Sequence, residues 1–574
     1  MARSNDAVAA ALREIAELLS IAGGEPFRIR AYEKAARGLA EHPVDLEGLD
    51  EHALVAIPGV GSHIAAKVRE LLETGRMGEL DDLRAQVPAG LRALLDVPGL
   101  GPKRARQVYE QLGVASMVEL LDALHGERLR TLRGWGPTSE ENLRRAIAQA
   151  QQEARRMPLD VALAVAEELI DDLRRLPDVR SAAYAGSLRR MCETIGDVDL
   201  LVASTEPDAV MEQFAGLPLV EEVSARGRTK AVARTAKGVH VDLRVVIPEV
   251  WGAALMYFTG SKAHNIHLRR IAQRNGMRLS EYGLVRVADG TVLAAATEAD
   301  VYAGLGLSWV PPTLREDRGE VDAALDGTLP HLVEVADIRG DLHVHTDLTD
   351  GLASLEDMVA AARRHRYRYL AITDHAPLLR MERMTTEKAL AQRAELRALE
   401  AHAGLALLHG SELNIQPDGS LDWDEETLAG FDVLVASVHS QFSMSREQMT
   451  ARLIRAIEHP AVNIIGHPTA RSIGRRPPID FDAEAVFDAA ARAGTALEIN
   501  SWPDRLDLDG ELARLAQDHG AVFAIDTDAH ATRHFDNIRY GVATAQRGWV
   551  SPDRVINTWP LPKLRAFLAK GRRR

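Results

Sequence analysis

The pattern of apolar and polar positions divides the chain into three parts. In the first third the pattern predicts helices, among them 62–72, 102–111 and 137–149. In the middle third, helical stretches alternate with apolar runs, and the predicted strands are 182–185, 198–203 and 239–247. The chain is therefore expected to be multidomain, with a helical first part and an α+β middle part.

From residue 340 onward, short apolar runs alternate regularly with helical patterns. The runs are 369–373, 406–408, 433–437, 463–465, 496–499 and 522–525. This order predicts parallel strands joined by crossover helices, an arrangement that can close into a barrel. The segment 311–337, which begins with two prolines and continues with mixed charges, has the composition of a linker.

Three short turns in the helical third resemble one another. They are Ile57-Pro58-Gly59-Val60-Gly61, Val97-Pro98-Gly99-Leu100-Gly101 and Leu132-Arg133-Gly134-Trp135-Gly136, and each precedes a predicted helix. The glycines permit a tight turn, and the N-terminus of the following helix presents free N–H groups to a phosphate. One such turn would indicate an ordinary helix connection, whereas three copies predict helix-hairpin-helix units that hold a DNA backbone without reading its sequence.

A glycine turn and three carboxylates in the middle third predict a nucleotide site. The segment Gly186-Ser187-Leu188-Arg189-Arg190 follows a predicted strand and begins a helix, which suits a triphosphate. After Gly196, Asp197 and Asp199 lie two residues apart, so that both project from one strand face, and Asp242 lies on another predicted strand. Alone, the first two aspartates would be turn residues, but together the three can hold two Mg²⁺ ions.

Potential metal ligands follow strand after strand in the last third. They are His343, His345, Asp350, His375, Glu412, His439, His467, Asp528 and His530. Most lie at the ends of predicted strands, the rim at which barrel active sites collect. Imidazole and carboxylate groups suit Zn²⁺ or Mn²⁺. The histidines expected to pack or to lie on the surface instead are His365, His402, His409, His459, His519 and His534.

Residues 1 to about 315 resemble a family X DNA polymerase, the family of polymerase beta. The resemblance rests on the motifs above and on Tyr257-Phe258-Thr259-Gly260-Ser261 and Leu279-Ser280-Glu281-Tyr282. It implies that Asp197, Asp199 and Asp242 bind two catalytic Mg²⁺ or Mn²⁺ ions. One departure is His240, which stands where polymerase beta has a basic residue before its third aspartate.

The same resemblance implies a nucleotide pocket. Gly186, Ser187, Arg190 and Gly196 are expected at the triphosphate, Tyr257, Phe258 and Gly260 at the sugar, Asn265 at the base edge and Arg269 at the template-side minor groove. Core packing is the alternative for Tyr257 and Phe258. Lys262 and Ile266 differ from the animal enzyme, so base selectivity is not carried over.

The amino-terminal region is similar to the lyase domain of this family, at Arg28 to Ala36 and Gly59 to Val68. The resemblance places Lys67 where the family has the lysine that forms a Schiff base with an abasic sugar, which requires an amine that can lose its proton. His63 replaces a second lysine of the 5′-phosphate pocket, so weak lyase activity and simple phosphate binding by Lys67 stand as alternatives. The residues expected to contact DNA are Tyr32, His63, Gly59, Gly61, Gly99, Gly101, Gly134 and Gly136.

Residues from about 338 to 574 resemble a PHP (polymerase and histidinol phosphatase) domain, a distorted (β/α)7-type barrel with up to three Zn²⁺ or Mn²⁺ ions. The resemblance implies one metal at His343, His345, Glu412 and Asp528, a second at Glu412, His439 and His467, and a third at Asp350, His375 and His530. It also implies hydrolysis of phosphate esters by a metal-activated hydroxide.

Together the resemblances imply a domain order and a function. The expected domains are a helical lyase-like domain (1–85), helix-hairpin-helix fingers (86–155), a nucleotidyltransferase palm (156–250), a thumb (251–315), a linker (316–337) and the PHP domain (338–574). This combination is typical of bacterial family X polymerases that fill short gaps in base excision repair or end joining, with a 3′–5′ exonuclease or related phosphoesterase. The expected substrates are dNTPs and gapped or nicked DNA with a 5′-phosphate, and the resemblance suggests a monomer.

Composition adds constraints. The net charge of −14 is unusual for a DNA-binding protein, but residues 1–315 contribute only −4 and residues 316–574 contribute −10. No run of about 18 apolar residues predicts a membrane span. The single cysteine, Cys192, excludes an internal disulfide and fits a reducing cytoplasm.

Two alternative functions stay open at this level. One is a phosphoesterase of histidinol-phosphatase type, in which the polymerase part serves only DNA binding, and this alternative leaves the aspartate array unexplained. The other is a non-enzymatic scaffold for DNA ends, which predicts gap binding without metal-dependent turnover.

Overall fold

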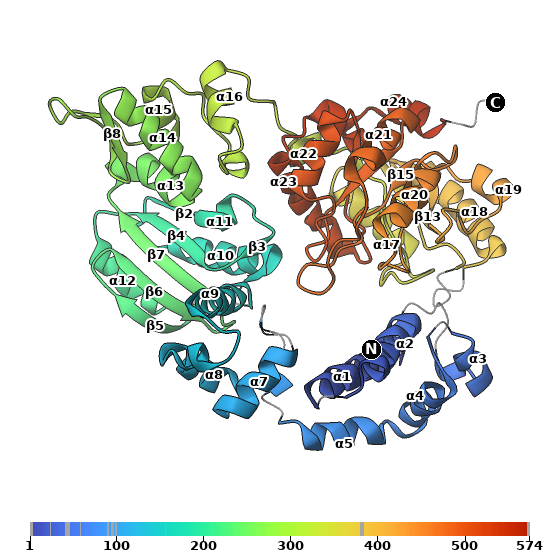
Figure 1. The fold of residues 1–574 in the computed structure, drawn as a ribbon. Coiled ribbons are helices and arrows are strands. Elements are labelled where there is room, and N and C mark those ends of the chain that lie inside the picture. The colour runs from blue at the N-terminus through green and yellow to red at the C-terminus, as the bar shows by residue number, and fades with distance from the viewer. Residues whose placement is uncertain are drawn as a thin grey trace. The chain divides into compact units, whose positions relative to one another are not determined.

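The chain forms two compact units, Met1–Arg155 and Arg156–Arg574, in the computed structural model (Figure 1). The structure describes residues 4–22, 24–40, 46–57, 59–88, 91–92, 94, 97, 100, 102–154, 156–378 and 384–570. Among these residues, no helix combines the length and the apolar character that crossing a membrane requires.

The first unit is helical throughout its described residues, as the pattern predicts. Its helices are α1 (Ser4–Ala22), α2 (Pro26–Ala40), α3 (Glu51–Val55), α4 (Ser62–Thr74), α5 (Gly78–Gln86), α7 (Pro102–Leu112), α8 (Met117–His125) and α9 (Pro137–Ala154). Their apolar faces share one core, and α4, α7 and α9 are the helices predicted after the three turns. Gly59 and Gly134 have φ of 91° and 87°, the left-handed region that glycine adopts without strain. Gly99 and Gly101 lie outside the described residues.

The second unit begins with a five-stranded sheet of order β2-β4-β7-β6-β5. The strands are β2 (Ser181–Tyr184), β4 (Val198–Ala203), β7 (His240–Val246), β6 (Lys230–Thr235) and β5 (Val220–Arg226), and only the central pair β4–β7 is parallel. On β6 and β7, buried and more exposed positions alternate, so one face packs against apolar residues of α10 (Leu159–Arg174) and α12 (Pro207–Ala215). The opposite face is left for polar side chains.

A smaller subdomain follows the palm sheet. It comprises α13 (Trp251–Thr259), α14 (Lys262–Arg274), β8 (Met277–Ser280), β9 (Gly283–Arg286), β10 (Val292–Ala294) and α15 (Glu298–Gly304). The segment 316–337, which is predicted to be a linker, contains α16 (Glu320–Asp326). Val321 and Ala324 of this helix are buried in the same core as α13 and α14, and buried Glu320 bonds His264 Nδ1 at 2.6 Å. The segment is therefore a packed connection, because its apolar residues are covered.

The remaining strands form a seven-stranded parallel sheet in sequence order. They are β11 (Gly340–Asp341), β12 (Tyr369–Ile372), β13 (Ala406–Asn414), β14 (Val433–Ser437), β15 (Ile464–Ile465), β16 (Ala496–Asn500) and β17 (Phe523–Asp526). A parallel bridge between Val344 and Ala529 joins the segments after the first and last strands. This bridge brings the two edges together, which confirms the barrel of (β/α)7 type.

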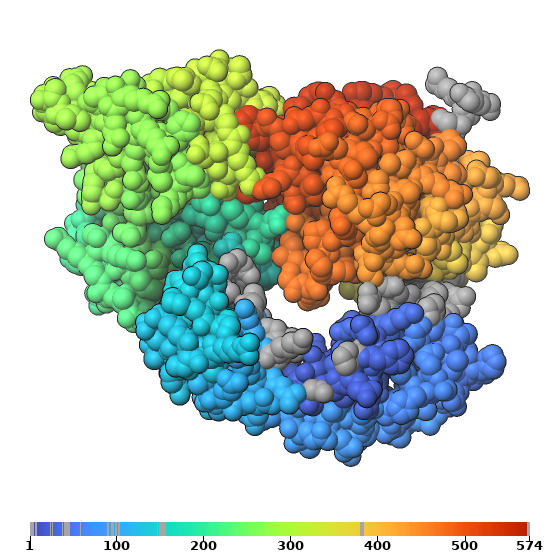
Figure 2. All heavy atoms as spheres, in the orientation of Figure 1, coloured from blue at the N-terminus to red at the C-terminus, as the bar shows by residue number. Residues whose placement is uncertain are grey.

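Helices cover the outside of the barrel (Figure 1). They are α17 (Leu355–Arg364), α18 (Thr386–Ala403), α19 (Glu425–Ala429), α20 (Arg446–Ile457), α21 (Ala483–Ala493), α22 (Gly510–Asp518) and α23 (Ile538–Arg547), and α24 (Leu561–Leu568) ends the described chain. Alternate strand residues such as Leu408, Ala496 and Ala524 share a second core with Leu564 of α24. In Figure 2 the green atoms of the palm and the following subdomain abut the orange and red atoms of the barrel.

Candidate active sites

The palm aspartates lie on neighbouring strands. The parallel register of β4 and β7 pairs Asp199 with Asp242, and Asp197 directly precedes β4. Burial, followed by the charges of Asp197 and Asp242, raises the pKa of Asp199 to about 7. A carboxylate is perturbed in this way when it is partly desolvated beside like charges, an arrangement that a cation relieves.

Gly186 is required by this arrangement. Its φ is 57°, and a Cβ at this position would lie 2.1 Å from Asp199 Oδ2 and 3.1 Å from Asp199 Cγ. The adjacent Ala185 N–H donates to the Asp199 carbonyl at 2.8 Å. The glycine turn that begins α11 (Gly186–Arg189) is therefore in direct contact with the central carboxylate.

The predicted triphosphate residue Arg190 is held by other protein groups in this structure. Its Nη1 donates to the Thr259 carbonyl at 2.7 Å and its Nε to Glu316 Oε1 at 3.0 Å. Neighbouring Arg189 pairs with Glu298, whose carboxylate also accepts from buried Arg315. The guanidinium groups after the glycine turn thus connect the palm to the following subdomain.

Aromatic and amide groups expected in the nucleotide pocket lie together. The rings of Tyr257 and Phe258 are 5.1 Å apart in an edge-to-face arrangement, and Arg269 Cζ lies 5.3 Å from the Tyr257 ring centre. Asn265 Nδ2 donates to the Tyr257 carbonyl at 2.7 Å, whereas its buried Oδ1 has no hydrogen-bond partner among the described residues. Arg244 Cζ lies 4.6 Å above Phe258.

The barrel ligands predicted from the sequence all lie in one connected cluster at the strand ends. Glu412 is its centre, with Oε1 3.1 Å from His439 Nε2 and 3.0 Å from His467 Nε2, and with Oε2 2.9 Å from His375 Nδ1. Asp350 Oδ2 lies 3.0 Å from His530 Nε2. Three groups have donor atoms within 4.8 Å of one another: His345, Asp350, His375 and His530; His343, His345 and Asp528; and His375, Glu412 and His439.

The chemistry of this cluster fits metal ions. Among the described residues, buried ring nitrogens of His343, His345 and His467 have no hydrogen-bond partner. Burial opposes charge on His375, yet Glu412 and Asp350 raise the pKa of His375 to about 10. Buried imidazoles with unpartnered nitrogens beside carboxylates are the donor set of a multinuclear site, because a metal satisfies both. Among the described residues, all groups of three or more potential ligands with donor atoms within 4.8 Å of one another lie in the barrel. The carboxylates of Asp197, Asp199 and Asp242 are therefore spaced more widely.

Outer partners that no sequence motif indicates orient these side chains. Buried Glu498 Oε1 lies 2.7 Å from His343 Nδ1, and Asn414 Oδ1 lies 2.8 Å from His439 Nδ1. A carboxylate or carbonyl oxygen on the second ring nitrogen fixes the tautomer of a ligating histidine. The sequence gives one indication of Glu498, because it is a charged residue inside a predicted strand that is otherwise apolar. His467 and Asp528 have φ of 27° and 53°, a strained region that is common at functional sites.

Family models match successive parts of the chain. A helix-hairpin-helix domain matches residues 3–77, a SAM-like helix-hairpin-helix tandem 91–149, the DNA polymerase beta thumb 254–316 and the PHP domain 341–501. The DNA polymerase/3′-5′ exonuclease PolX of Bacillus subtilis (strain 168) is 36% identical over 98% of both chains. The chain belongs to the family X DNA polymerases that carry a PHP domain.

Two further relatives are each similar to part of this family X chain. DNA polymerase lambda of Rattus norvegicus is 29% identical over 51% of this chain and 53% of its own length. A probable phosphatase of Shewanella sediminis (strain HAW-EB3) is 30% identical over 40% of this chain and 93% of its own length.

Lys230 lies at the palm site, although no motif in the sequence indicates it. Its Nζ lies 3.0 Å from Asp242 Oδ2, from the neighbouring strand β6, whereas His240 at the start of β7 is exposed. The basic partner of the third aspartate is thus supplied from an adjacent strand, a position that linear comparison of the motif does not reveal.

Lys67 in the first unit is ion-paired. Its Nζ lies 2.5 Å from Glu79 Oε2, which also accepts a hydrogen bond from Tyr32 at 2.7 Å, and Arg28 pairs with the same carboxylate. Burial opposes ionisation of Glu79, but Lys67 and Tyr32 lower the pKa of this carboxyl overall. His63 is exposed on the same helix.

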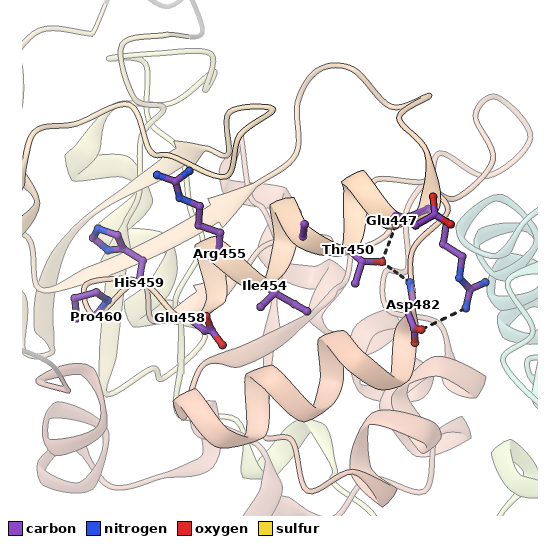
Figure 3. A pocket seen from close by; sticks show the side chains of 10 residues that line it. Glu447, Thr450, Ile454, Arg455, Glu458, His459, Pro460 and Asp482 are labelled. Atoms are coloured by element: carbon purple, nitrogen blue, oxygen red, sulfur yellow. Dashed lines mark hydrogen bonds and ion pairs between the residues drawn. The ribbon is translucent and has the colours of Figure 1, made fainter.

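A separate pocket of about 840 Å³ lies along α20 (Figure 3). None of the expected ligands lines it, and its polar groups bond one another. Asp482 N donates to Thr450 Oγ1 at 2.8 Å, and Thr450 donates to the Arg446 carbonyl at 2.7 Å. Because these groups are mutually satisfied, we assign no chemistry to this pocket.

Proposed function

We propose that this chain is a DNA-directed DNA polymerase that fills short gaps in DNA repair, and that its PHP domain is a 3′–5′ exonuclease acting on DNA ends. The observation that carries the proposal is the presence of two distinct ligand sets in one compact unit. One is the aspartate triad behind the Gly186 turn, and the other is the histidine-rich cluster centred on Glu412. The match over nearly the full length of a polymerase/exonuclease supports the pairing.

In the palm, Asp197, Asp199 and Asp242 would hold two Mg²⁺ or Mn²⁺ ions. Such ions, when bound, favour deprotonation of the primer 3′-hydroxyl and neutralise the triphosphate and the leaving pyrophosphate. Gly186 leaves the space in which Asp199 faces the nucleotide, and Ser187, Arg190 and Gly196 bind the triphosphate. Lys230 orients Asp242 through the 3.0 Å contact.

The thumb side of the pocket positions the nucleotide. Tyr257, Phe258 and Gly260 line the sugar, Asn265 directs its unpartnered Oδ1 to the base edge, and Arg269 reaches the template-side minor groove. The bond from Asn265 Nδ2 to the Tyr257 carbonyl couples the base and sugar contacts. An Asn265 side chain fixed to the backbone of Tyr257 in this way restricts the orientation of the incoming dNTP.

In the barrel, we propose ligand sets for up to three Zn²⁺ or Mn²⁺ ions, and the first two sets share Glu412. They are His343, His345, Glu412 and Asp528; Glu412, His439 and His467; and Asp350, His375 and His530. Glu498 and Asn414 hold His343 and His439 in the orientation that leaves Nε2 of each ring toward the cluster. The substrate phosphodiester lies against these residues at the rim of the barrel.

The first unit binds the DNA. We propose domain boundaries at 1–85, 86–155, 156–250, 251–315, 316–337 and 338–574, with Gly59, Gly61, Gly99, Gly101, Gly134 and Gly136 in the phosphate-binding turns and with Tyr32 and His63 beside the 5′-phosphate of the gap. Lyase chemistry at Lys67 is weak, because its Nζ is engaged in an ion pair with the Glu79 carboxylate and is not free to attack an abasic sugar. The protein works as a monomer on gapped or nicked DNA.

The decisive experiment compares two activities on one substrate, a one-nucleotide gap with a 5′-phosphate, in Mg²⁺ or Mn²⁺. The Asp197→Ala, Asp199→Ala double variant is expected to lose primer extension and keep primer degradation. His343→Ala is expected to do the reverse. Absence of extension by the wild-type chain in both metals refutes the polymerase proposal, and hydrolysis of small phosphate monoesters alone would instead favour a phosphatase of histidinol-phosphatase type.

A further inference from the structure

The segment after β16 forms a closed turn at the rim of the barrel. Asn500 and Asp507 pair in an antiparallel bridge, in which Asn500 N donates to the Asp507 carbonyl at 2.6 Å. Within this bridge, Trp502 N donates to Asn500 Oδ1 at 2.9 Å, and Arg505 N donates to the Trp502 carbonyl at 2.8 Å. Because its ends and its interior are bonded, the turn presents its side chains from a rigid base.

The palm supports the outer side of this turn. Leu506 is fully buried in the hydrophobic core of the palm, with β4 and α10 residues. Arg471 Nε donates to the Arg505 carbonyl at 2.7 Å, and its Nη2 donates to Glu193 of the palm at 2.6 Å. The turn therefore contacts the palm on one side and lies beside the ligand cluster on the other.

Two side chains of the turn face the ligand cluster. The Trp502 ring centre lies 5.6 Å from that of His530, with the planes nearly perpendicular. Arg505 Nε lies 3.7 Å from Asp528 Oδ2, and its side chain is 28% exposed.

Within the described residues, no hydrogen bond that holds the fold uses the side-chain polar groups of Trp502 or Arg505. Neither belongs to the expected metal ligands, and among the described residues no side-chain hydrogen bond of 3.5 Å or less from Arg505 occurs. A guanidinium offers donors in a fork that matches two oxygens of a phosphate. An indole offers a face on which a nucleobase of any sequence can stack.

We propose that Trp502 and Arg505 bind the 3′-terminal nucleotide of an unpaired DNA strand, with Arg505 on the non-bridging oxygens of the scissile phosphodiester and Trp502 stacked on the terminal base. The inference rests on the proposed exonuclease function and identifies the residues that select its substrate. A base stacked on Trp502 has left its partner in the duplex. The site therefore prefers a frayed or mismatched 3′ end to a paired one.

The experiment uses the full chain with Mn²⁺ and a labelled single strand that ends in either a normal nucleotide or a base-free tetrahydrofuran residue. Trp502→Ala should raise KM about 10-fold for the normal end and leave the base-free end unchanged. Trp502→Phe should recover most of the difference. Arg505→Ala should raise KM about 10-fold or more for both ends, Arg505→Lys should recover part, and the metal content should stay at the wild-type value.

Arg475→Ala is the matched control, because Arg475 is 79% exposed and lies 3.7 Å from Asp504 in the same turn. Equal slowing of both ends by Trp502→Ala would mean that the indole only supports the fold of the turn, and loss of metal in Arg505→Ala would mean that Arg505 acts through Asp528. Wild-type kinetics in both alanine variants overturn the proposal as well. Failure of the wild-type chain to degrade either strand is a different result, since it removes the proposed exonuclease function itself.

Discussion

At the scale of single residues, the smallest side chain at the palm site has the largest steric role. A methyl group on Gly186 would lie 2.1 Å from Asp199 Oδ2, and the residue has a φ of 57°. Gly186→Ala is therefore expected to displace Asp199 and to lower primer extension at least 100-fold, since a misplacement of about 1 Å can cost this much. Gap extension by the purified variant measures the effect.

The control for this substitution is Gly238→Ala. Gly238 also has a positive φ, of 78°, but a Cβ there meets no atom within 4 Å. It should therefore show the backbone cost alone, with extension close to wild type. If both variants extend equally well, the close packing of Gly186 on Asp199 is irrelevant to catalysis.

His409 provides a pH-dependent contribution to stability. It is fully buried on β13, its ring centre lies 4.7 Å from that of Phe431, and burial, followed by the charge of Arg393, lowers its pKa to about 3. Between pH 6.5 and 3 the unfolded chain binds a proton at this position that the folded chain does not bind. The free energy of unfolding should therefore fall by about 1.4 kcal/mol per pH unit below pH 6.5 from this residue alone.

Urea unfolding of wild type and His409→Gln at pH 7.5 and 5.5 checks this expectation. The stability difference between the two proteins should narrow by about 1 kcal/mol at the lower pH, because glutamine does not titrate. His402→Gln, at an exposed position on α18, is the control and should leave the difference constant. A difference that is independent of pH for His409→Gln would show that the folded protein accepts the proton.

The residues that the sequence could identify are those whose chemistry is local. Asp197 and Asp199 lie two residues apart at the start of β4, and His343 and His345 lie two residues apart after β11. Spacing alone therefore brings each pair together. Lys230 and Glu498 were missed because their partners, Asp242 and His343, are distant in sequence and meet them only through strand pairing and barrel closure. Residue type and spacing therefore predict ligands better than they predict the groups that orient them.

At the scale of elements, the strands with both faces buried were predicted closely. The predicted runs 198–203 and 433–437 coincide with β4 and β14. The antiparallel strands β5 and β6 were not predicted, since both carry charged residues, and β6 buries only one face while no residue of β5 is buried. β13 is longer than its predicted run, because the polar residues His409, Glu412 and Asn414 continue it into the ligand cluster.

Arg452 of α20 joins the ends of two strands that carry ligands. Its buried guanidinium donates to the Ile415 carbonyl after β13 and, at 3.0 Å, to the Ser440 carbonyl after β14. Arg452→Met leaves both carbonyls without this donor and frees the segments that follow Glu412 and His439. We expect exonuclease activity to fall about 10-fold or more, with gap extension within about 2-fold of wild type.

Arg455→Ala, one turn along the same helix, controls for loss of a positive charge. The side chain of Arg455 is 61% exposed, and among the described residues its polar contacts are with the carbonyl and the carboxylate of Asp418. Its removal should therefore change neither activity. Metal content of the Arg452 variant should fall together with its exonuclease activity. Equal loss of both enzymatic activities would point to general unfolding instead.

At the scale of the whole molecule, the second unit is held together by contacts that cross from the barrel to the palm. Leu506 and Tyr540 of the barrel belong to the hydrophobic core of the palm. Arg547 of α23 donates to the Arg190 carbonyl at 2.9 Å and lies 3.0 Å from Glu316. These contacts place two activities in one folding unit, although the sequence shows only two separate family resemblances, because the contact residues carry no motif.

Arg471 tests this coupling. It is nearly buried and joins Glu193 of the palm to the carbonyls of Arg505 and Leu506 in the barrel turn. Arg471→Met removes these bonds and the 3.4 Å bond to Asp509 Oδ2, and it leaves Glu193 without this partner at the interface. We therefore expect the free energy of unfolding of the second unit to fall by about 3 kcal/mol. Glu193→Gln should cost less, since the bonds from Arg471 to the turn persist.

The double variant separates the interface from the turn. If Glu193 and Arg471 act as a pair, the two effects on stability should not add, and the coupling energy should be about 1 kcal/mol or more. Exonuclease activity should fall with Arg471→Met and change little with Glu193→Gln, because only the former releases the Arg505 carbonyl. Additive effects on stability, with exonuclease activity unchanged in both variants, would show that the palm and the barrel merely touch, and that the barrel holds its substrate-binding turn without help from the polymerase.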